Sequence, residues 1–248
     1  MEVSRFESER RKIGEGKQAD VYYWDGSAYK VYRSGASPEQ IEWEFRQQSL
    51  ACQTGLPVAA YYKTGDPRVV RMDYINGVTL ADRVLQNGYQ GAVHDMVRLQ
   101  KQVHSCKGDG FPAFTAFLQW DLPRIGLAQG QKETVLRLLS EFEEKDCLCH
   151  LDFHPLNIMW SNDRYFIIDW ANARRGNPIF DFARTYVILF EIAQASAREY
   201  LELLLRDKTV SLPAMEKAVY VMALLRIGDY DNPEVRRLIG QLEDGRGL

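Results

Sequence analysis

The feature that most constrains the fold is a change of pattern near residue 77. Before it, the segments IGEGKQADVYYW and SAYKVYR are rich in β-branched and aromatic residues, and Asp25-Gly26 joins them as in tight β-hairpins. After Asn76-Gly77, apolar residues recur at helical spacing over residues 79–87, 92–105, 131–144, 178–206 and 212–227. The sequence therefore predicts an α+β protein with a small antiparallel sheet lobe, residues 1–77, and a larger, mainly helical lobe, residues 78–248.

One helix is expected inside the sheet lobe. Ser37-Pro38 combines a favoured N-cap with a proline at the first turn, and the segment EQIEWEFRQQSLACQT continues the helix until Gly55 and Pro57 end it. Two further strands follow, around residues 58–62 and 69–74. The predicted lobe is thus a sheet with a single helix.

Composition excludes several classes of protein. The chain has 248 residues, of which 46% are hydrophobic, so it is long enough to bury a sizeable core. A formal net charge of -3 gives no reason to expect a nucleic acid as partner. No run of about 18 apolar residues predicts a membrane span, and the N-terminal segment MEVSRFESERRKIGEG lacks the apolar centre of a signal peptide. We expect a soluble cytoplasmic protein, and the sequence does not indicate an oligomeric state.

The four cysteines are a poor disulfide framework and fit a reducing compartment. Two of them, Cys147 and Cys149, immediately precede His150. This spacing is compatible with a metal site, but no second ligand pair accompanies it. The alternative is that both side chains occupy one face of a buried strand.

The segment GEGKQADV, from Gly14 to Val21, fits the pattern G-x-G-x-x-G-x-V with Ala19 in place of the third glycine. It spans a predicted hairpin instead of a strand-to-helix turn, which excludes a dinucleotide-binding fingerprint. Glycines at a hairpin tip allow the backbone to close over phosphates, so the segment is either a nucleotide cover or a plain hairpin.

Lys30 lies in the middle of an apolar strand and shares a face with Ala28. A charge there is costly unless it is paired. Glu44, in the predicted helix between Trp43 and Phe45, is the natural partner, and Glu39 and Glu42 are the alternatives.

The segment CHLDFHPLNIMW gathers two histidines, an aspartate and an asparagine. His150, Asp152 and His154 alternate, so they are candidates for a zinc site, a catalytic loop or a simple turn cap. Further on, Asp169 follows an apolar run that reads as a buried strand. Oxygen ligands for Mg²⁺ together with an acceptor for a hydroxyl proton are what phosphoryl transfer requires, and these residues provide both.

Taken in order, these motifs resemble the aminoglycoside phosphotransferase and choline kinase superfamily, the small-molecule branch of the protein-kinase-like fold. The resemblance covers nearly the whole chain and includes MDYINGVTL at the lobe crossing and GNPIFDFA, which contains Asp181. It implies a bilobal fold, ATP as phosphoryl donor with GTP not excluded, and Mg²⁺ as cofactor.

The resemblance also implies residue roles. Lys30, held by Glu44, contacts the nucleotide phosphates, Asp152 is the catalytic aspartate, and Asn157 and Asp169 bind Mg²⁺. His150 is expected to support the catalytic loop. Asp181 is either a second support or an acid favoured at a helix N-terminus. The remaining nucleotide-binding positions are Gly14, Gly16, Val21 and Ala28, and in the adenine-facing hinge Met72, Asp73, Tyr74 and Ile75.

The acceptor is expected to be a small hydroxyl-bearing molecule. Eleven residues separate Asp169 from Asp181, too few for the activation segment with which protein kinases present a peptide, and Trp170-Ala171 replaces the Phe-Gly pair of those kinases. Acidic side chains in the helical lobe favour an amine on the acceptor, although each is also compatible with an ordinary solvated helix face. These acids are Glu141, Glu143, Glu144, Asp146, Glu191, Asp229 and Asp231.

Aromatic rings offer the amine a second route, through cation–π contact, and each ring is equally a core candidate: Trp120, Trp170 and Tyr230. Two alternatives to an aminoglycoside-type kinase stay open. One is a choline, ethanolamine or sugar kinase of metabolism. The other is a catalytically silent nucleotide-binding protein with a kinase-like fold.

Overall fold

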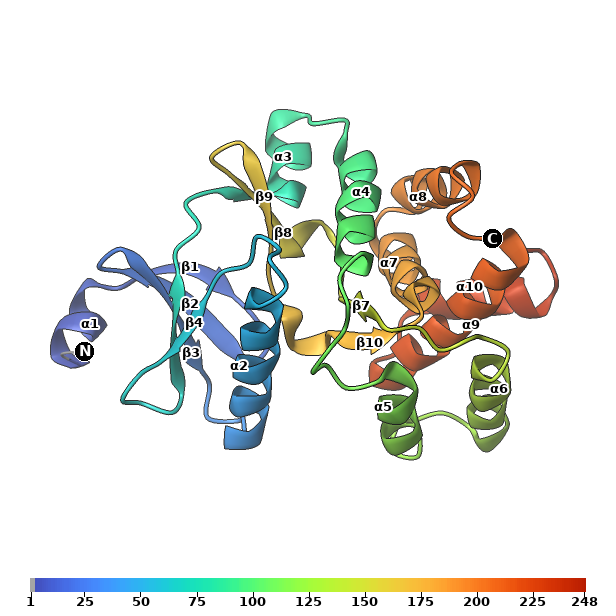
Figure 1. The fold of residues 1–248 in the computed structure, drawn as a ribbon, viewed down its shortest axis with the longest axis horizontal. Coiled ribbons are helices and arrows are strands. Elements are labelled where there is room, and N and C mark those ends of the chain that lie inside the picture. The colour runs from blue at the N-terminus through green and yellow to red at the C-terminus, as the bar shows by residue number, and fades with distance from the viewer. Residues whose placement is uncertain (1–2) are drawn as a thin grey trace. The chain divides into compact units, whose positions relative to one another are not determined.

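The protein is described here from a computed structural model covering residues 3–248 (Figure 1). The chain forms two compact units. The first contains the residues up to Arg83 together with Leu156–Ala171, and the second contains Val84–Pro155 and Asn172–Leu248. Residues 156–171 therefore belong to the first unit by their contacts, whereas the sequence analysis placed all residues after Gly77 in the helical lobe.

The first unit is built on a five-stranded antiparallel sheet of order β1-β2-β3-β5-β4. Its hairpins follow the predicted pattern: Asp25 and Gly26 have φ values of 46° and 75° and close the β2–β3 turn. The strands are β1 (Arg11–Glu15), β2 (Ala19–Trp24), β3 (Ser27–Tyr32), β4 (Tyr61–Lys63) and β5 (Val69–Asp73).

Helix α2 (Pro38–Cys52) covers one face of this sheet (Figure 1). Its start is the predicted one: the Ser37 hydroxyl accepts the backbone N–H of Gln40, and the Gln40 side chain accepts that of Ser37. Ile41 joins a cluster with Tyr32 and Val70 of the sheet, which fixes the helix against the strands. Phe6 of the short helix α1 (Val3–Glu9) packs against Tyr29 and Val69, whose side chains alternate along their strands with those that face α2.

A second, three-stranded sheet of order β6-β8-β9 also belongs to the first unit. Its strands are β6 (Val78–Thr79), β8 (Ile158–Ser161) and β9 (Arg164–Ile167). β8 and β9 form a hairpin, and short 3₁₀ turns flank it, η1 (Pro155–Asn157) and η2 (Trp170–Asn172). The predicted buried strand before Asp169 is therefore confirmed as β9.

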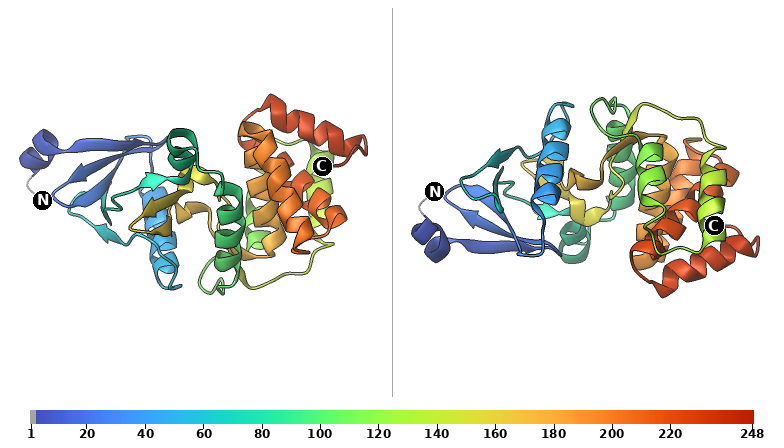
Figure 2. Two further views of the ribbon diagram at one scale, coloured as in Figure 1. Left: turned by 90° about the horizontal axis from the view of Figure 1, so that it is seen from above. Right: turned by 90° about the horizontal axis from the view of Figure 1, so that it is seen from below.

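The second unit is mainly helical and is organised around α7 (Pro178–Ile192), which is buried along most of its length. It contacts α8, α9 and α10, which gather around it (Figure 2). A two-stranded sheet of β7 and β10 lies in the same unit. Helix α3 (Leu80–Asn87) crosses the boundary between the units, and the other elements are α4 (Ala92–His104), α5 (Phe114–Asp121), α6 (Gln129–Leu139), α8 (Gln194–Arg206), α9 (Leu212–Asp229), α10 (Pro233–Glu243), β7 (Cys147–Cys149) and β10 (Arg174–Gly176).

Two helix predictions need correction, and three helices were missed. The segment 178–206 is two helices, because the backbone leaves helical geometry at Ala193 (φ -157°, ψ 75°), and neither glycine nor proline marks this break in the sequence. The helix expected over 131–144 ends at Leu139, where three carboxylates at 141, 143 and 144 would face the negative end of the helix dipole. Helices α1, α5 and α10 were not predicted.

The cysteine pair lies in strand β7, which pairs with β10, as the buried-strand interpretation expected. Cys149 is buried and Cys147 is partly buried. Within residues 3–248, no group of three or more His, Cys, Asp or Glu side chains is arranged to hold a metal ion. Among the helices of the same residues, none combines the length and apolar character that crossing a bilayer needs.

Candidate functional site

The glycine-containing segment forms the predicted hairpin between β1 and β2. Gly14 pairs with Val21 beside a register shift, and the backbone N–H of Gly16 donates to the carbonyl of Ala19 at 2.9 Å. A Cβ on Gly16 would lie 3.3 Å from that carbonyl oxygen, so a larger residue would crowd the turn. The hairpin tip is therefore narrow and offers mainly backbone groups.

The strand register brings four of the predicted nucleotide-binding side chains to one sheet face. Val21 pairs with Lys30, and Ala28 pairs with Met72. Directly paired residues of antiparallel strands point to the same side, and positions 28 and 30 share a face of β3. Tyr32, on the same face, packs with α2, so the four side chains lie on the α2 side of the sheet.

Lys30 forms an ion pair with Glu44, and the predicted partner is confirmed. Their side chains are 18% and 10% exposed, so both charges are largely removed from water. The alternative partner Glu42 is instead paired with exposed Lys63 at 2.8 Å. The Lys30 ammonium is thus fixed in place by α2 on the sheet face that carries Val21 and Ala28.

Electrostatic contacts link this pair to Asp169. Burial, followed by the charges of Glu44 and Asp169, raises the pKa of Tyr61 well above its ordinary value. The hydroxyl of Tyr61 lies 3.5 Å from Glu44 Oε1. A neutral tyrosine therefore sits within the field of both carboxylates, which brings Lys30, Glu44 and Asp169 into one neighbourhood of the first unit.

The β8–β9 hairpin brings the two predicted metal ligands to the same end of a ladder. Ile158 pairs with Ile167, and the carbonyl of Asn157 accepts the backbone N–H of Ile168 at 3.0 Å, so Asp169 follows directly after the last contact. Asp169 has φ +64°, a strained region for a residue other than glycine. Trp43 of α2 donates to the carbonyl of Ala171 at 3.0 Å and fixes the backbone just beyond it.

In the second unit, the segment that carries His150 and Asp152 is anchored by Asp181. This carboxylate is fully buried and accepts the backbone N–H groups of His150 (3.0 Å) and Leu151 (2.6 Å). His104 Nε2 contacts it at 2.7 Å. Leu151 has φ +58°, and the donation from its own N–H stabilises this left-handed conformation. Of the two interpretations of Asp181, these contacts favour the loop support.

A second set of hydrogen bonds fixes the same loop at Phe153. Its carbonyl accepts the hydroxyl of Thr185 at 3.0 Å, and Gln100 donates to that hydroxyl at 3.0 Å. Gln100 in turn accepts a hydrogen bond from Tyr200. All of these side chains are buried, so a polar chain runs from α8 through α4 and α7 to the loop.

The sequence missed His104, Gln100, Thr185 and Tyr200. Each is a single polar residue on an apolar helix face, and nothing local distinguishes it from an ordinary buried residue. Asp181, by contrast, could be predicted from the sequence, because it follows Asn177-Pro178 and belongs to the segment GNPIFDFA.

The carboxyl group of Asp152 is ionised near neutral pH. Burial raises its pKa, but the nearby side chains of His154, His150 and Arg184 outweigh burial and lower the pKa below its ordinary value. His154 Nε2 lies 3.8 Å from Asp152 Oδ2. An ionised carboxylate in a doubly anchored loop is able to accept a proton or a hydrogen bond from a hydroxyl group.

The predicted hinge begins at the end of β5. The side chain of Asp73 accepts the backbone N–H of Ala60 at 3.0 Å and the hydroxyl of Tyr62 at 3.1 Å, which fixes the strand end. Tyr74 and Ile75 lie beyond the strand, and their main-chain groups make no backbone hydrogen bond within the described part of the chain. These groups are therefore available to a ligand.

Most acids expected to attract an amine already have cationic partners. Glu141 pairs with Arg137 and Lys217, Asp146 with Arg175, Glu191 with Arg226, Asp229 with Arg184 and Asp231 with Arg236. Of the three aromatic candidates, Trp170 is fully buried, Trp120 is covered by the Arg124 guanidinium at 4.6 Å, and Tyr230 is bonded to Glu191.

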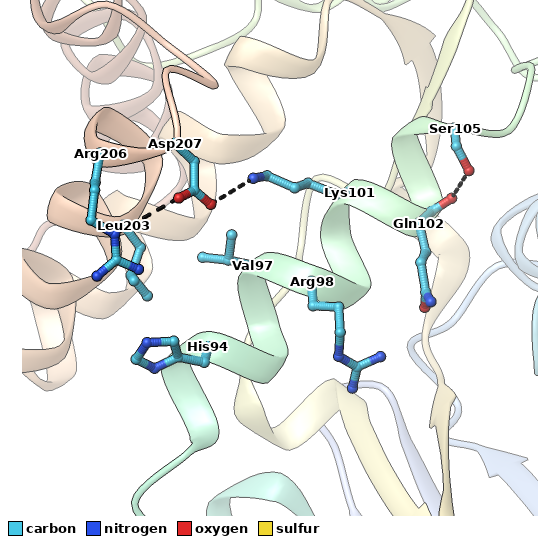
Figure 3. A pocket seen from close by; sticks show the side chains of 9 residues that line it. All are labelled: His94, Val97, Arg98, Lys101, Gln102, Ser105, Leu203, Arg206 and Asp207. Atoms are coloured by element: carbon cyan, nitrogen blue, oxygen red, sulfur yellow. Dashed lines mark hydrogen bonds and ion pairs between the residues drawn. The ribbon is translucent and has the colours of Figure 1, made fainter.

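Two cavities of the second unit differ sharply in their relation to these residues. One, of about 450 Å³, lies between α4 and α8 and is bordered by the Lys101–Asp207 ion pair (Figure 3). It contains none of the predicted site residues. The other, of about 180 Å³, includes Leu151, the neighbour of Asp152 in the anchored loop.

Comparison with known proteins identifies the family of the chain. Residues 9–211 match the model of the phosphotransferase enzyme family. The chain belongs to this family. Family membership confirms the predicted enzyme class, a small-molecule phosphotransferase acting on hydroxyl groups. None of the curated proteins matches the sequence.

Solved structures similar to this phosphotransferase include three of particular interest. A thermostable mutant of aminoglycoside phosphotransferase APH(4)-Ia in apo form is 15% identical, with 100% of both chains covered and a TM-score of 0.70. Choline kinase LicA from Streptococcus pneumoniae is 16% identical, with 97% of each chain covered and a TM-score of 0.68. APH(2″)-IIa, in its complex with streptomycin and ATP, is 18% identical over 98% of this chain and 96% of that one, with a TM-score of 0.60. These likenesses confirm the predicted bilobal, kinase-like fold.

Proposed function

We propose that this phosphotransferase transfers the γ-phosphoryl group of ATP to a hydroxyl group of a small acceptor. The observation that carries the proposal is the ionised Asp152 in a loop that Asp181 holds by two backbone N–H groups. Phosphoryl transfer needs positioning and electrostatic stabilisation more than covalent chemistry, and a fixed carboxylate meets the first need. Solved structures of APH(4)-Ia hold AMP-PNP with hygromycin B, which supports a nucleotide donor here as well.

On the donor side, Lys30 is proposed to contact the ATP phosphates while Glu44 fixes the ammonium. The backbone of the Gly14–Gly16 tip would cover the phosphates, and Val21 and Ala28 would face the base from the same sheet side. The main-chain groups of Tyr74 and Ile75 are proposed to bind the adenine edge, because they are free of backbone partners in the described chain.

Magnesium fits the donor set that the chain offers. Asn157 and Asp169 provide an amide and a carboxylate oxygen at one end of the β8–β9 hairpin, and Mg²⁺ prefers such hard ligands, with its other positions left to water and phosphate. When bound, the ion would supply positive charge against the phosphate oxygens. We propose these two residues as its ligands.

Asp152 is proposed to orient the acceptor hydroxyl and to take up its proton as the phosphoryl group arrives. His154 lowers the pKa of Asp152 and so keeps this carboxylate in the proton-accepting form. The loop anchors at Asp181 and Thr185 hold the carboxylate in position, which is the contribution that a rigid scaffold makes to such a reaction.

The amine expected on the acceptor is a finer proposal. Solved relatives bind amine-bearing antibiotics, namely hygromycin B, streptomycin and gentamicin, and this supports it. The existing ion pairs of the acidic side chains weaken the electrostatic argument. The second candidate is a choline, ethanolamine or sugar kinase. No observation favours a catalytically silent protein. A cytoplasmic location stays a prediction from the sequence.

The test is ATP consumption by the full chain with a panel of hydroxyl-bearing metabolites and antibiotics. Stimulation by one acceptor class is expected, and Lys30→Met should lower kcat/KM for ATP by about tenfold or more, since it removes a buried charge from the phosphate site. Lys63→Met is the matched control, because Lys63 is exposed and pairs with Glu42. ATP binding without turnover for any acceptor would instead identify a silent nucleotide-binding protein.

A further inference from the structure

The 180 Å³ cavity of the second unit has walls from α5, α7, α9 and the anchored loop. Its volume corresponds to roughly six water molecules, smaller than the pockets that hold drug-sized ligands. Leu151 brings it beside the Asp152 position, and two arginines, Arg174 and Arg184, also line it. A space of this size next to the loop suits a small acceptor.

Arg184 is the unusual member of this wall. The residue is 9% exposed, yet its guanidinium forms no hydrogen bond with any residue that the structure describes. Its nearest acid is Asp229, at 3.7 Å between Nη2 and Oδ2, which is too far for a hydrogen bond. A guanidinium has five N–H donors in a planar fork, and this one borders the cavity.

A second arginine lines the same cavity. Arg174 adds a second buried positive charge, lies 4.2 Å over the Phe117 ring and donates to the carbonyl of Ala173. The acids of the cavity are more exposed, with Asp229 at 58% and Asp121 at 38% of their side chains. The buried charge of the cavity wall is therefore positive.

Helix α7 places Arg184 in a defined relation to the catalytic loop. Asp181, which holds the loop, lies one turn earlier on the same helix, and Thr185, which holds it again, is the next residue. The charge of Arg184 is also within electrostatic range of Asp152. A group bound by Arg184 would thus lie a short distance from the proposed site of proton transfer.

We propose that the acceptor is a small hydroxy acid whose carboxylate is bound by Arg184, with its hydroxyl directed toward Asp152. This rests on the proposed kinase function and names its substrate class, and a carboxylate-bearing acceptor does not require the amine proposed above. The planar guanidinium fork matches the two oxygens of a carboxylate, and such bidentate pairs are among the strongest hydrogen-bonded contacts in proteins. The acceptor carboxylate would bind the Arg184 guanidinium where this side chain lines the cavity.

The experiment measures binding of D-glycerate, glyceramide and glycerol 3-phosphate to the full chain by calorimetry, without nucleotide. Glycerate and glyceramide have the same number of heavy atoms and differ in charge. We expect glycerate to bind at least tenfold more tightly than glyceramide, and Arg184→Gln to remove this preference. Arg124→Gln, which changes an exposed arginine close to the cavity, is the control and should alter binding less than twofold.

Two further variants keep the test decisive if Arg184→Gln fails to fold. Arg184→Lys keeps the charge but loses the fork, so glycerate binding should weaken while remaining above that of glyceramide. Asp229→Asn removes the acid nearest to Arg184 and should strengthen glycerate binding. Weaker glycerate binding in Asp229→Asn, or equal binding of glycerate and glyceramide to the parent, would overturn the proposal.

The remaining outcomes separate this inference from the kinase assignment. Tight binding of glycerol 3-phosphate without binding of glycerate would identify a phosphate, not a carboxylate, as the group that Arg184 binds. This result would overturn the hydroxy-acid class. Binding needs no phosphoryl transfer, so loss of the carboxylate preference leaves the kinase function standing. Conversely, an absence of turnover with every acceptor would count against the kinase while the binding result stands.

Discussion

Replacement of Asp181 should damage both stability and turnover, because one carboxylate holds three partners in a buried site. Asp181→Ala leaves the N–H groups of His150 and Leu151, now 3.0 and 2.6 Å from an acceptor, without one, and removes the 2.7 Å contact of His104. Hydrogen bonds to a charged group contribute about 1.5–3 kcal/mol each, and relief of the buried charge offsets part of the sum. We expect a loss of about 3–5 kcal/mol in the free energy of unfolding.

The milder Asp181→Asn keeps one acceptor oxygen, so its loss in the free energy of unfolding should be about half that of Asp181→Ala. Turnover should fall in both variants even where they remain folded, because Leu151 would no longer be held at φ +58° and Asp152 follows it in the chain. Urea unfolding monitored by circular dichroism measures the first effect, and ATP consumption with the stimulating acceptor measures the second.

Asp207→Ala is the matched control, since Asp207 is exposed and pairs with Lys101 on the surface. An unfolding free energy for Asp181→Ala equal to that of Asp207→Ala would refute the reasoning.

The pH dependence gives a second check. Burial raises the pKa of Asp181, but the bond to His104, nearby positive charges and the N–H of Leu151 lower it overall. The stabilisation is therefore present above the unfolded pKa of about 3.9, and the gap between parent and Asp181→Asn should narrow below about pH 4.

Three other predictions concern the reaction itself. Asp152→Asn should lower turnover by about 10² to 10⁴ while nucleotide affinity stays near that of the parent, and a parent-like rate would contradict the assignment. Asp169→Ala should nearly abolish Mg²⁺-dependent ATP binding and Asn157→Ala should weaken it less, so calorimetry with unchanged affinity in Asp169→Ala would count against the metal site. Because the pKa of Asp152 is lowered, its protonation should reduce kcat only below about pH 4, and an acid limb near pH 6 that Asp152→Asn abolishes would contradict this.

The sequence predicts well where local chemistry and global structure agree. A lysine in an apolar strand requires a buried acid, and Glu44, which lies between Trp43 and Phe45 in α2, proved to be its partner. The Asp25-Gly26 turn, the Ser37-Pro38 helix start and the strand before Asp169 were predictable for the same reason, because each is specified by a few adjacent residues.

The sequence predicts poorly where a contact joins segments far apart in the chain. His104 meets Asp181 across 77 positions, and Gln100 meets Thr185 across 85, with no local pattern that selects either pair. The break at Ala193 likewise has no local signal, since neither glycine nor proline marks it. Arg184 was hidden for a different reason: an arginine in a helix is interpreted as a surface residue until its burial is known.

The joint placement of Asp181, Arg184 and Thr185 on α7 has a consequence for how specificity is able to change. One rigid helix fixes the reactive loop and also presents the proposed recognition group, so any substitution that tilts it alters rate and selectivity together. Altered preference without loss of rate must then come from the opposite wall, where Phe117 and Met222 line the same space from α5 and α9. Laboratory evolution toward new acceptors should accordingly accumulate changes on those two helices and leave α7 almost untouched.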